Sequence, residues 1–343
     1  MPKSTGGFDP SRLTVPPRPA GVVQSILRPQ EVEARGFAEI RVIGVGGGGG
    51  NAVNRIVREG VQGIDCIAVN TDTQALEGSL ASRHVQIGQH VTGGRGAGGD
   101  PERGRRAAEE GREAIDHVVA GADMVFVTTG LGGGTGTGAS PVVADAARAG
   151  GALTVGVVTR PFKFEGLRRR TVAEAGLTEL MACVDALLII PNERLLELAT
   201  RRASLTDMFD MADGVILEGI RGITDVIVTT GLINVDFADV RAVMQGGGLA
   251  MMSSGSGRGA RRAEDAARQA ITSSMLETSI HGATSVLLNI TGGPDLTLQD
   301  VNRAAEMVAE AVDPEANIIF GAFIHPRMTD SMKLTLIATG LQG

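Results

Sequence analysis

The glycines of this chain are gathered in short blocks, and they constrain the fold more than any other feature of the sequence. Of the 343 residues, 49 are glycine, about twice the usual share of roughly 7%. Four blocks stand out, at residues 46–50, 93–99, 130–138 and 246–248. They show no three-residue period, which excludes a collagen-like chain. Glycine concentrated in this way indicates places where the backbone comes close to a ligand or to another segment of backbone.

The rest of the composition is that of a globular protein and excludes several function classes. A net charge of −7 argues against a nucleic-acid partner, and the chain has no Trp or Tyr to stack on bases. Cys66 and Cys183 lie in apolar runs typical of reduced core cysteines, and the five histidines are too scattered to be metal ligands. No apolar run approaches a membrane span or a secretory signal. We therefore expect a soluble, cytoplasmic chain with no metal site of its own and no direct membrane insertion.

Length and hydrophobic patterning predict an extension followed by two domains. Residues 1–37 hold six of the thirteen prolines and are expected to form a flexible extension. From 38 to 203, strands alternate with helices, which predicts an α/β fold with a Rossmann-like parallel sheet covered on both faces. The expected strands are 39–45, 66–70, 124–129, 153–158 and 186–190, and the expected helices are 51–59, 100–119, 140–148 and 167–182.

A long helix is expected to separate this domain from a smaller one. Apolar residues recur with a 3.6-residue period from Ser204 over 204–228, which predicts a core helix about 36 Å long. Residues 229–343 are expected to form a smaller α/β domain. Its expected elements are a short helix after the long one, a helix at 260–274, a helix capped by Thr297, and strands at 285–290, 318–323 and 333–338.

The glycine blocks allow more than one kind of phosphate site. Gly44, Gly46 and Gly49 fit a dinucleotide fingerprint between a strand and a helix, with Asp72 as a candidate ribose-binding acid, but the match is weak. A P-loop is excluded because no lysine lies in any glycine block. The third block, GGGTGTG at 132–138, follows a buried strand and opens a helix. It predicts a lysine-free site for a polyphosphate, whereas the block at 246–248 is interpreted as structural.

Several of these motifs resemble those of a known family. The GGGTGTG block resembles the signature of the tubulin superfamily. VIGVGGGGGNAV from Val42, AVNTD ending at Asp72 and NVDFADVR from Asn234 resemble the FtsZ family of bacterial cell-division GTPases, and the similarity runs from about Ile40 to Gly340. The resemblance implies a GTP-binding domain at 38–203, a core helix at 204–228 and a C-terminal domain at 229–343. It also implies GTP and GDP as ligands, Mg²⁺ bound through phosphates and water, and a head-to-tail homopolymer that joins division-ring proteins at mid-cell.

The same resemblance assigns nucleotide-binding residues. The first block with Asn51 would hold the α- and β-phosphates, Ala97 with the next two glycines would face the γ-phosphate, and the third block would surround the rest. On the long helix, Phe209 would stack on the base, and Asp213 would accept hydrogen bonds from the two adjacent donors of guanine. Alternative readings stay open: Phe209 as a core residue, Asp213 as a solvated helix residue, and Glu165 with Arg169 as a surface pair. The full set is Gly46, Gly47, Gly48, Gly49, Gly50, Asn51, Ala97, Gly98, Gly99, Gly132, Gly133, Gly134, Thr135, Gly136, Thr137, Glu165, Arg169, Asn192, Phe209 and Asp213.

Two acids after the long helix are the candidate catalytic groups. Asp236 and Asp239 stand three residues apart at a helix start, where a cap and a favourable dipole position would be the ordinary explanation. They lie beyond the far end of a helix whose beginning carries Phe209 and Asp213, so they are expected to act on the nucleotide of a neighbouring subunit. With Asn234 they would orient a water molecule for attack on the γ-phosphate, because an aspartate is a weak base at neutral pH.

Three departures from the family pattern leave alternatives open. Asp100 stands where the family more often has Asn, and Gly214 replaces a polar residue beside Asp213. The sequence also stops at Gly343 without the flexible linker and adaptor-gripping peptide of the family, so we expect either a truncated chain or a form that polymerises without that tether. A mainly structural filament paralogue that co-assembles with a relative and turns over little GTP is therefore a second hypothesis. A nicotinamide-dependent oxidoreductase is a remote third.

Overall fold

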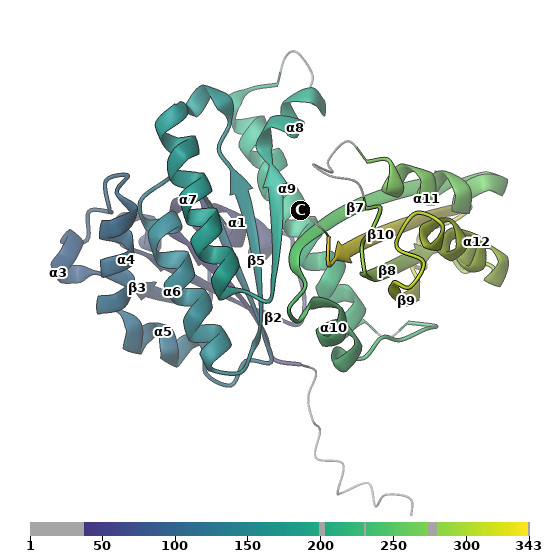
Figure 1. Cartoon of the computed structure of the whole chain (residues 1–343), viewed down its shortest axis with the longest axis horizontal. Helices are drawn as coiled ribbons and strands as arrows, with labels where there is room; N and C mark the ends of the chain where they lie inside the picture. The colour runs from purple at the N-terminus through teal and green to yellow at the C-terminus, as the bar shows by residue number, and fades with distance from the viewer. Residues whose placement is uncertain (1–37, 199–202, 230, 274–279, 342–343) are drawn as a thin grey trace, which may run out of the picture. The chain divides into compact units, whose positions relative to one another are not determined.

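Six parallel strands form one half of a ten-stranded sheet (Figure 1). They are β1 (Ile40–Val45), β2 (Ile64–Asn70), β3 (Arg83–Gln86), β4 (Met124–Gly130), β5 (Leu153–Arg160) and β6 (Ala186–Pro191). Their order in the sheet is β3-β2-β1-β4-β5-β6, and every neighbouring pair is parallel. The predicted Rossmann-like parallel sheet is confirmed. The computed structural model describes residues 38–198, 203–229, 231–273 and 280–341, so the predicted extension at 1–37 lies outside the described residues.

Alternate residues of each strand face opposite hydrophobic clusters. Val42 packs with Phe126 and Ile56 on one face of the sheet, whereas the neighbouring Ile43 packs with Val127 on the other. This two-residue period places apolar side chains under helices on both faces, as parallel sheets require. The helices of this half are α1 (Gly46–Arg58), α2 (Thr73–Glu77), α3 (Gln89–Thr92), α4 (Pro101–Glu110), α5 (Arg112–Val119), α6 (Thr135–Ala149), α7 (Leu167–Cys183) and α8 (Asn192–Leu198), with a single 3-10 turn η2 (Lys163–Glu165).

Some boundaries differ from the predicted ones. α1 begins at Gly46 instead of residue 51, and α6 begins at Thr135 instead of residue 140. The first glycine block and the end of the third are therefore the first turns of helices and not loops in front of them. The helix predicted over 100–119 is two helices that meet at Gly111, where an added Cβ would lie 2.7 Å from Cγ2 of Ile87. The predictions missed β3 and the short helices α2, α3 and α8.

The predicted long helix is confirmed as α9 (Leu205–Val228), which has 24 residues. Ser204 caps it: its hydroxyl accepts from the N–H of Asp207 (3.1 Å), and the Asp207 carboxylate accepts from the N–H of Ser204 (2.8 Å). Ile216 and Ile220 pack into the cluster that holds Val42, so α9 lies against the parallel sheet. Among the described residues, no helix has both the length and the apolar character needed to cross a membrane, α9 included.

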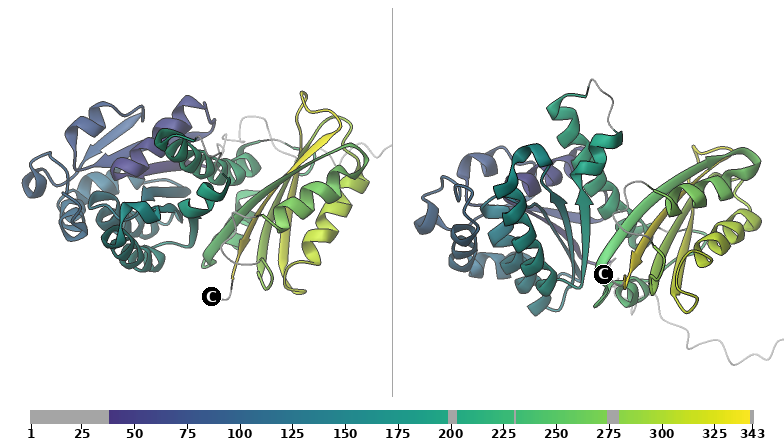
Figure 2. Two further views of the ribbon diagram at one scale, coloured as in Figure 1. Left: turned by 90° about the horizontal axis from the view of Figure 1, so that it is seen from above. Right: turned by 45° about the horizontal axis from the view of Figure 1, so that its top comes forward.

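The second half of the sheet is mixed, with α11 (Arg262–Ile271) and α12 (Leu298–Ala309) packed against one face (Figure 2) and α10 (Phe237–Met244) packed against the other. β7 pairs with β6 in parallel and with β10 antiparallel, so it joins the two halves. β10 pairs antiparallel with β8, and β8 pairs in parallel with β9. The predicted cap at Thr297 is confirmed, because its hydroxyl accepts from the N–H of Asp300 (3.2 Å). The elements are α10 (Phe237–Met244), β7 (Gly248–Arg258), η3 (Gly259–Arg261), α11 (Arg262–Ile271), β8 (Ser285–Gly292), α12 (Leu298–Ala309), β9 (Asn317–Ile324) and β10 (Ser331–Thr339).

β7 is the largest element that sequence analysis missed. Its second half reads SSGSGR, a composition typical of loops. The glycines are needed because α11 packs against the bare backbone: a Cβ added at Gly255 would lie 2.0 Å from the carbonyl oxygen of Ala266. Gly246, just before β7, and Gly248, its first residue, have φ of +66° and +63°, which supports the structural interpretation of the fourth glycine block. The domain boundaries at 203/204 and 228/229 stay predictions.

Gly214 offers a test of helix packing within α9. A Cβ added there would meet only Nη2 of Arg55, at 3.9 Å, whereas a Cβ at Gly219 would come within 3.0 Å of Cδ2 of Leu188. Gly214→Ala is expected to raise the free energy of unfolding by up to about 1 kcal/mol, because alanine loses less backbone entropy in a helix. Gly219→Ala is the matched control and is expected to show no such gain. Urea unfolding of both ligand-free variants tests this, and equal effects would contradict it.

Candidate functional site

A cavity of about 340 Å³ lies at the carboxyl edge of the parallel sheet. Its walls come from the segments that follow β1, β4, β5 and β6, and from the first turns of α9. β1 and β4 are neighbours in the sheet although they are not consecutive in the chain, so the strand order reverses between them. Open α/β sheets bind ligands at such a point. The volume is that of an ordinary small-ligand site.

Two helix N-termini converge on one end of this cavity. α1 starts directly after β1, and α6 starts after β4. Gly46 has φ of +69°, and a Cβ there would lie 2.7 Å from the amide nitrogen of Gly136, so any side chain would force the two helices apart. The first N–H groups of a helix have no partner within the helix, and the helix dipole adds positive potential there. Two such ends together can bind a polyphosphate without a lysine.

A third backbone segment closes the same end. Ala97, Gly98 and Gly99 line the cavity, and both glycines have positive φ (+64° and +76°). The segment packs against the start of α6, since a Cβ added at Gly134 would lie 2.8 Å from Cβ of Ala97. Asp100, a departure from the family pattern, caps α4: its carboxylate accepts from the N–H of Glu102 (3.1 Å). It is not among the described residues that line the cavity.

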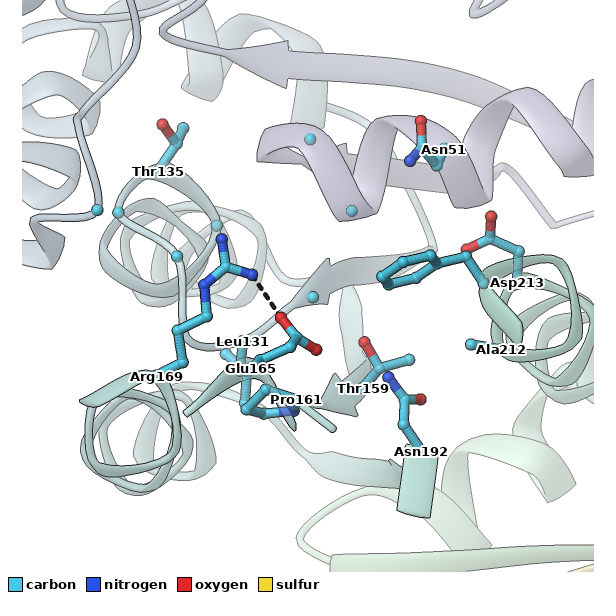
Figure 3. Close-up of a pocket in the computed structure, with 18 of the residues that line it drawn as sticks. Asn51, Leu131, Thr135, Thr159, Pro161, Glu165, Arg169, Asn192, Ala212 and Asp213 are labelled. Atoms are coloured by element: carbon cyan, nitrogen blue, oxygen red, sulfur yellow. Dashed lines mark hydrogen bonds and ion pairs between the residues drawn. The ribbon is translucent and has the colours of Figure 1, made fainter. Parts of the chain in front are cut away.

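The other end of the cavity offers an aromatic ring and buried polar groups. Phe209 is 42% exposed and meets Phe162 edge-on at 5.7 Å, so it is a wall of the cavity and only partly a core residue. Asn192, at the end of β6, is 4% exposed, and its Oδ1 has no hydrogen-bond partner in the described part of the chain. Figure 3 shows Asn192 and Asp213 on the side of the cavity opposite Thr135. A buried, unpaired acceptor costs free energy unless a ligand supplies a donor.

Asp213 carries an unusual carboxyl group. Burial is the main cause that raises its pKa to about 6, and Asp210 adds to the effect, while Arg55 and Arg58 oppose it. At neutral pH the Asp213 carboxyl group is therefore charged, although its buried surroundings disfavour the charge. Perturbed carboxyl groups of this kind concentrate at functional sites. Asp213 is only partly exposed and lines the cavity, which argues against the alternative of a solvated helix residue.

Glu165 and Arg169 form an ion pair on the cavity wall (Figure 3). Glu165 is held from both sides, because its carboxylate also accepts from the N–H of Phe162 (2.9 Å). Its side chain is only 12% exposed, against 57% for Arg169. The surface-pair alternative is therefore right about the pairing, and the pair also lines the cavity. A fixed acid beside a movable guanidinium can accept from hydroxyl groups and contact an anion.

Most of the predicted binding residues line the cavity, and five do not. Those that line it are Gly47, Gly48, Asn51, Ala97, Gly98, Gly99, Gly133, Gly134, Thr135, Gly136, Glu165, Arg169, Asn192, Phe209 and Asp213; those that do not are Gly46, Gly49, Gly50, Gly132 and Thr137.

The exceptions have other surroundings. Gly46 and Gly50 line a smaller cavity on the other side of the α1 start. A Cβ at Gly49 would lie 2.3 Å from the carbonyl oxygen of Thr128. The N–H of Gly132 donates to the hydroxyl of Thr137 (2.9 Å), which holds the turn before α6. The contacts of Gly46, Gly49, Gly132 and Thr137 indicate that these four residues shape the backbone around the cavity.

Sequence reasoning missed six lining residues: Gly130, Leu131, Thr159, Pro161, Ala212 and Ile216. Four of them lie at or directly after the carboxyl ends of β4 and β5, and the strand-edge rule could have found them. Ala212 and Ile216 share a helix face with Phe209, three and seven residues away. Asp72, the candidate acid of the dinucleotide alternative, instead caps α2 by accepting from the N–H of Gln74 (3.0 Å).

The three predicted catalytic residues lie together but apart from the cavity. Asp236 and Asp239 are exposed at the start of α10, and the Asp236 carboxylate accepts from the N–H of Asp239 (2.8 Å), so the ordinary cap is present. Asn234 is also exposed, and its Oδ1 accepts from the N–H of Gly231 (2.6 Å). None of them is among the described residues that line the cavity. All three follow the end of α9, whose beginning carries Phe209 and Asp213.

The chain matches two family models and several solved structures. Residues 39–200 match the GTPase domain of the Tubulin/FtsZ family, and residues 248–342 match the C-terminal domain of the FtsZ family. An empty FtsZ dimer from M. jannaschii is 42% identical, with 92% of this chain and 93% of that chain covered and a TM-score of 0.85. GDP-bound CetZ1 from Haloferax volcanii is 26% identical (89% and 95% covered, TM-score 0.77). A GTPγS-bound CetZ2 protofilament from the same organism is 25% identical (89% and 93%, TM-score 0.74).

Titration of Asp213 makes the unfolding free energy of the ligand-free protein depend on pH. Its folded pKa of about 6 exceeds the ordinary value of 3.8, so the folded state binds the proton more tightly. The resulting stabilisation is present below about pH 4 and is lost as the pH rises through 6. Asp213→Asn has no carboxyl group at this position, so it does not lose stability in this way. The unfolding free energy of Asp213→Asn minus that of wild type is therefore expected to rise by about 2 kcal/mol between about pH 4 and pH 7.5.

Urea unfolding of the ligand-free protein at the two pH values measures this difference. Glu113→Gln, which removes an exposed acid from α5, is the control and is expected to show no comparable change. An advantage of Asp213→Asn that is the same at both pH values would contradict the prediction.

Proposed function

The chain belongs to the tubulin/FtsZ family, and from this premise we propose that it binds GTP in the cavity and hydrolyses it as part of a head-to-tail filament. One observation carries the proposal. A lysine-free anion site built from two helix N-termini lies at one end of the cavity, and a largely buried carboxylate lies at the other. A ligand that satisfies both ends is a polyphosphate joined to a base with adjacent donors.

Guanine fits the Asp213 end better than adenine does. An ionised carboxylate only accepts hydrogen bonds, and guanine offers N1–H and N2–H₂ side by side, whereas adenine offers no such pair. A site built around such a group discriminates strongly, because the wrong base leaves the buried charge unpaired. In the proposed complex Phe209 stacks on the base, Asn192 pairs with another polar group, and Glu165 and Arg169 contact the ribose and the adjoining phosphate.

Mg²⁺ is proposed to enter with the nucleotide. The anion end of the cavity is lined by backbone and by Thr135, and the lining carboxylates are Glu165, which is paired with Arg169, and Asp213, at the base end. No group of three or more His, Cys, Asp or Glu within the described ranges could hold a metal ion. Mg²⁺ prefers oxygen ligands and keeps several waters, which suits a cation held by phosphate oxygens. Bound there, it would neutralise charge on the phosphates.

The catalytic acids are proposed to come from the next subunit. Asp236, Asp239 and Asn234 follow the far end of α9 and do not line the cavity of their own chain. If the end of one subunit that carries α10 docks on the cavity of the next, these groups can orient a water for in-line attack on the γ-phosphate. Such a contact joins unlike surfaces and propagates as a filament. The dimer and protofilament named among the related structures support self-association.

The cellular role is a further part of the proposal. Filaments of this kind would form a division ring at mid-cell, together with other division-ring proteins and without insertion of this chain into the membrane. The family match to a GTPase domain replaces the oxidoreductase alternative. Measured GTP turnover distinguishes the proposed GTPase from the structural-paralogue alternative. Under that alternative, the purified chain would assemble but release little phosphate.

Pelleting with GTP or GDP, with phosphate release followed in the same tube, tests the proposed function directly. GTP is expected to give a sedimentable polymer and continuous phosphate release that rises steeply with protein concentration, while GDP gives neither. Turnover that is strictly proportional to protein concentration, with no polymer, would contradict hydrolysis at a shared site. Polymer without turnover would favour the structural paralogue.

Asp239→Ala is expected to lower GTP turnover by about 100-fold, because the attacking water loses an orienting group. GDP affinity should stay within about twofold of wild type, since Asp239 does not line the cavity. Glu113→Ala, which removes another exposed acid from the first turn of a helix, is the matched control. Unchanged turnover in Asp239→Ala would remove this residue from the catalytic set.

A mixing experiment tests whether the site is shared. Asp239→Ala keeps an intact nucleotide site, and Asp213→Asn keeps the catalytic acids Asp236 and Asp239. A mixed polymer therefore contains interfaces at which an intact nucleotide site meets intact catalytic acids. In an equal mixture about a quarter of the interfaces are of this kind, and turnover should exceed the sum of the two variants alone. Strictly additive inactivity would count against catalysis across subunits.

A further inference from the structure

Thr71 lies at the carboxyl end of β2, fully buried, and it connects two walls of the cavity without lining the cavity itself. Its hydroxyl forms a 2.6 Å hydrogen bond with the hydroxyl of Thr135, the first residue of α6. Its carbonyl oxygen accepts from the N–H of Gly96 and from the hydroxyl of Thr92, both at 3.3 Å. One residue therefore joins the start of α6 to the second glycine block.

The second glycine block depends on such ties for its position. Gly93, Gly98 and Gly99 have positive φ, and a Cβ at any of them would meet no described atom within 4 Å, so these three positions are not held by close packing. Besides the bond to Thr71, the N–H of Thr73 donates to the carbonyl of Gly94 (3.1 Å). Asp72 and Arg95 pair as an isolated antiparallel bridge. Residues 71–73 therefore act as the short partner strand that places residues 94–96.

The C-terminal end of the same segment also contacts the start of α6. Ala97 and the backbone of Asp100 crowd against Gly134, where an added Cβ would lie 2.8 Å from Cβ of Ala97 and from the amide nitrogen of Asp100. The turn that carries Gly98 and Gly99 into the cavity is thus held against α6 at residue 134 and, through Thr71, at residue 135. The Thr71–Thr135 bond is the polar half of this attachment, and it is buried from water.

We propose that Thr71 is a positioning residue that couples the segment facing the γ-phosphate to the α6 turn that holds the other phosphates. The proposal rests on the proposed function, in which residues 97–99 face the γ-phosphate. With the hydroxyl bond in place, GTP binds to a segment that is already in position. Without it, the segment must be ordered when GTP binds. GDP lacks the γ-phosphate and does not need the segment.

A purely structural role for this bond predicts a different result. A buried hydroxyl left without its partner destabilises the protein as a whole, and binding of GDP and GTP would then weaken together. A positioning role instead lowers the ratio of the GTP affinity to the GDP affinity. The ratio is therefore the measurement that separates the two roles.

Thr71→Val removes the hydroxyl and keeps the β-branched shape, whereas Thr71→Ser keeps the hydroxyl. We expect Thr71→Val in the full chain to weaken binding of a non-hydrolysable GTP analogue by about tenfold, the usual scale for a lost buried hydrogen bond. GDP binding should weaken by no more than about threefold, and Thr71→Ser should restore the wild-type ratio. Thr154→Val removes another fully buried hydroxyl, in β5, which donates to the carbonyl of Ala152 (3.1 Å), and should leave the ratio unchanged.

The pair can also be broken from its other side. Thr135→Val is expected to lower the same ratio, and the double variant should lower it no further, because both substitutions remove one bond. If Thr71→Val does not fold, Thr71→Ala is measured in its place, because Thr135 itself lines the cavity and its substitution also changes a proposed direct contact to the nucleotide. A wild-type ratio in whichever variant folds, or equal losses for both nucleotides, would overturn the proposal. Wild-type protein that binds neither nucleotide would instead overturn the proposed function.

Discussion

The approach of two helix N-termini at the carboxyl edge of the parallel sheet is the constraint on which the rest of the site depends. α1 starts directly after β1, α6 starts after a short turn that follows the neighbouring β4, and Gly46 lies so close to Gly136 that only glycine fits. Unpaired N–H groups from both helices then point into one cavity. The strand order, the glycine surplus and the absence of lysine from these loops all follow from that arrangement, because backbone supplies the positive potential that a P-loop takes partly from a side chain.

The glycines divide into two kinds once their surroundings are known. Some are forced by contact between backbones, as at Gly49 against Thr128 and Gly134 against Asp100. Others, such as Gly47 and Gly98, meet nothing within 4 Å and line the cavity, so a ligand can approach their amide groups closely. The same residue type therefore serves packing and binding within a single block. This explains why the predicted binding set included four glycines and one threonine that do not line the cavity.

Sequence analysis predicted the parallel sheet and the long helix because hydrophobic period is a local signal, and the glycine blocks indicated a phosphate site; most of the cavity residues were assigned only through the resemblance to a known family. It could not predict where α1 and α6 begin, since a run of glycines is a poor helix former and only the packing of both helices orders it. β7 was missed for a related reason: its small residues are fitted to the backbone of α11, which is visible only in three dimensions. The raised pKa of Asp213 depends on burial between α9 and its neighbours, and Thr71 acts through Thr135, 64 residues away in the sequence.

The length of α9 links the fold to the way activity would be controlled. The helix places Phe209 and Asp213 at the cavity and leads to the loop with Asn234 and Asp236 beyond its other end, so the folded monomer keeps its binding and catalytic groups apart. If those groups act together, the proposed catalytic site forms only at a contact between subunits. Hydrolysis would then be confined to subunits inside a filament, and a free subunit would keep its GTP until it assembles. In that arrangement the fold itself, with no added regulatory element, makes turnover depend on protein concentration.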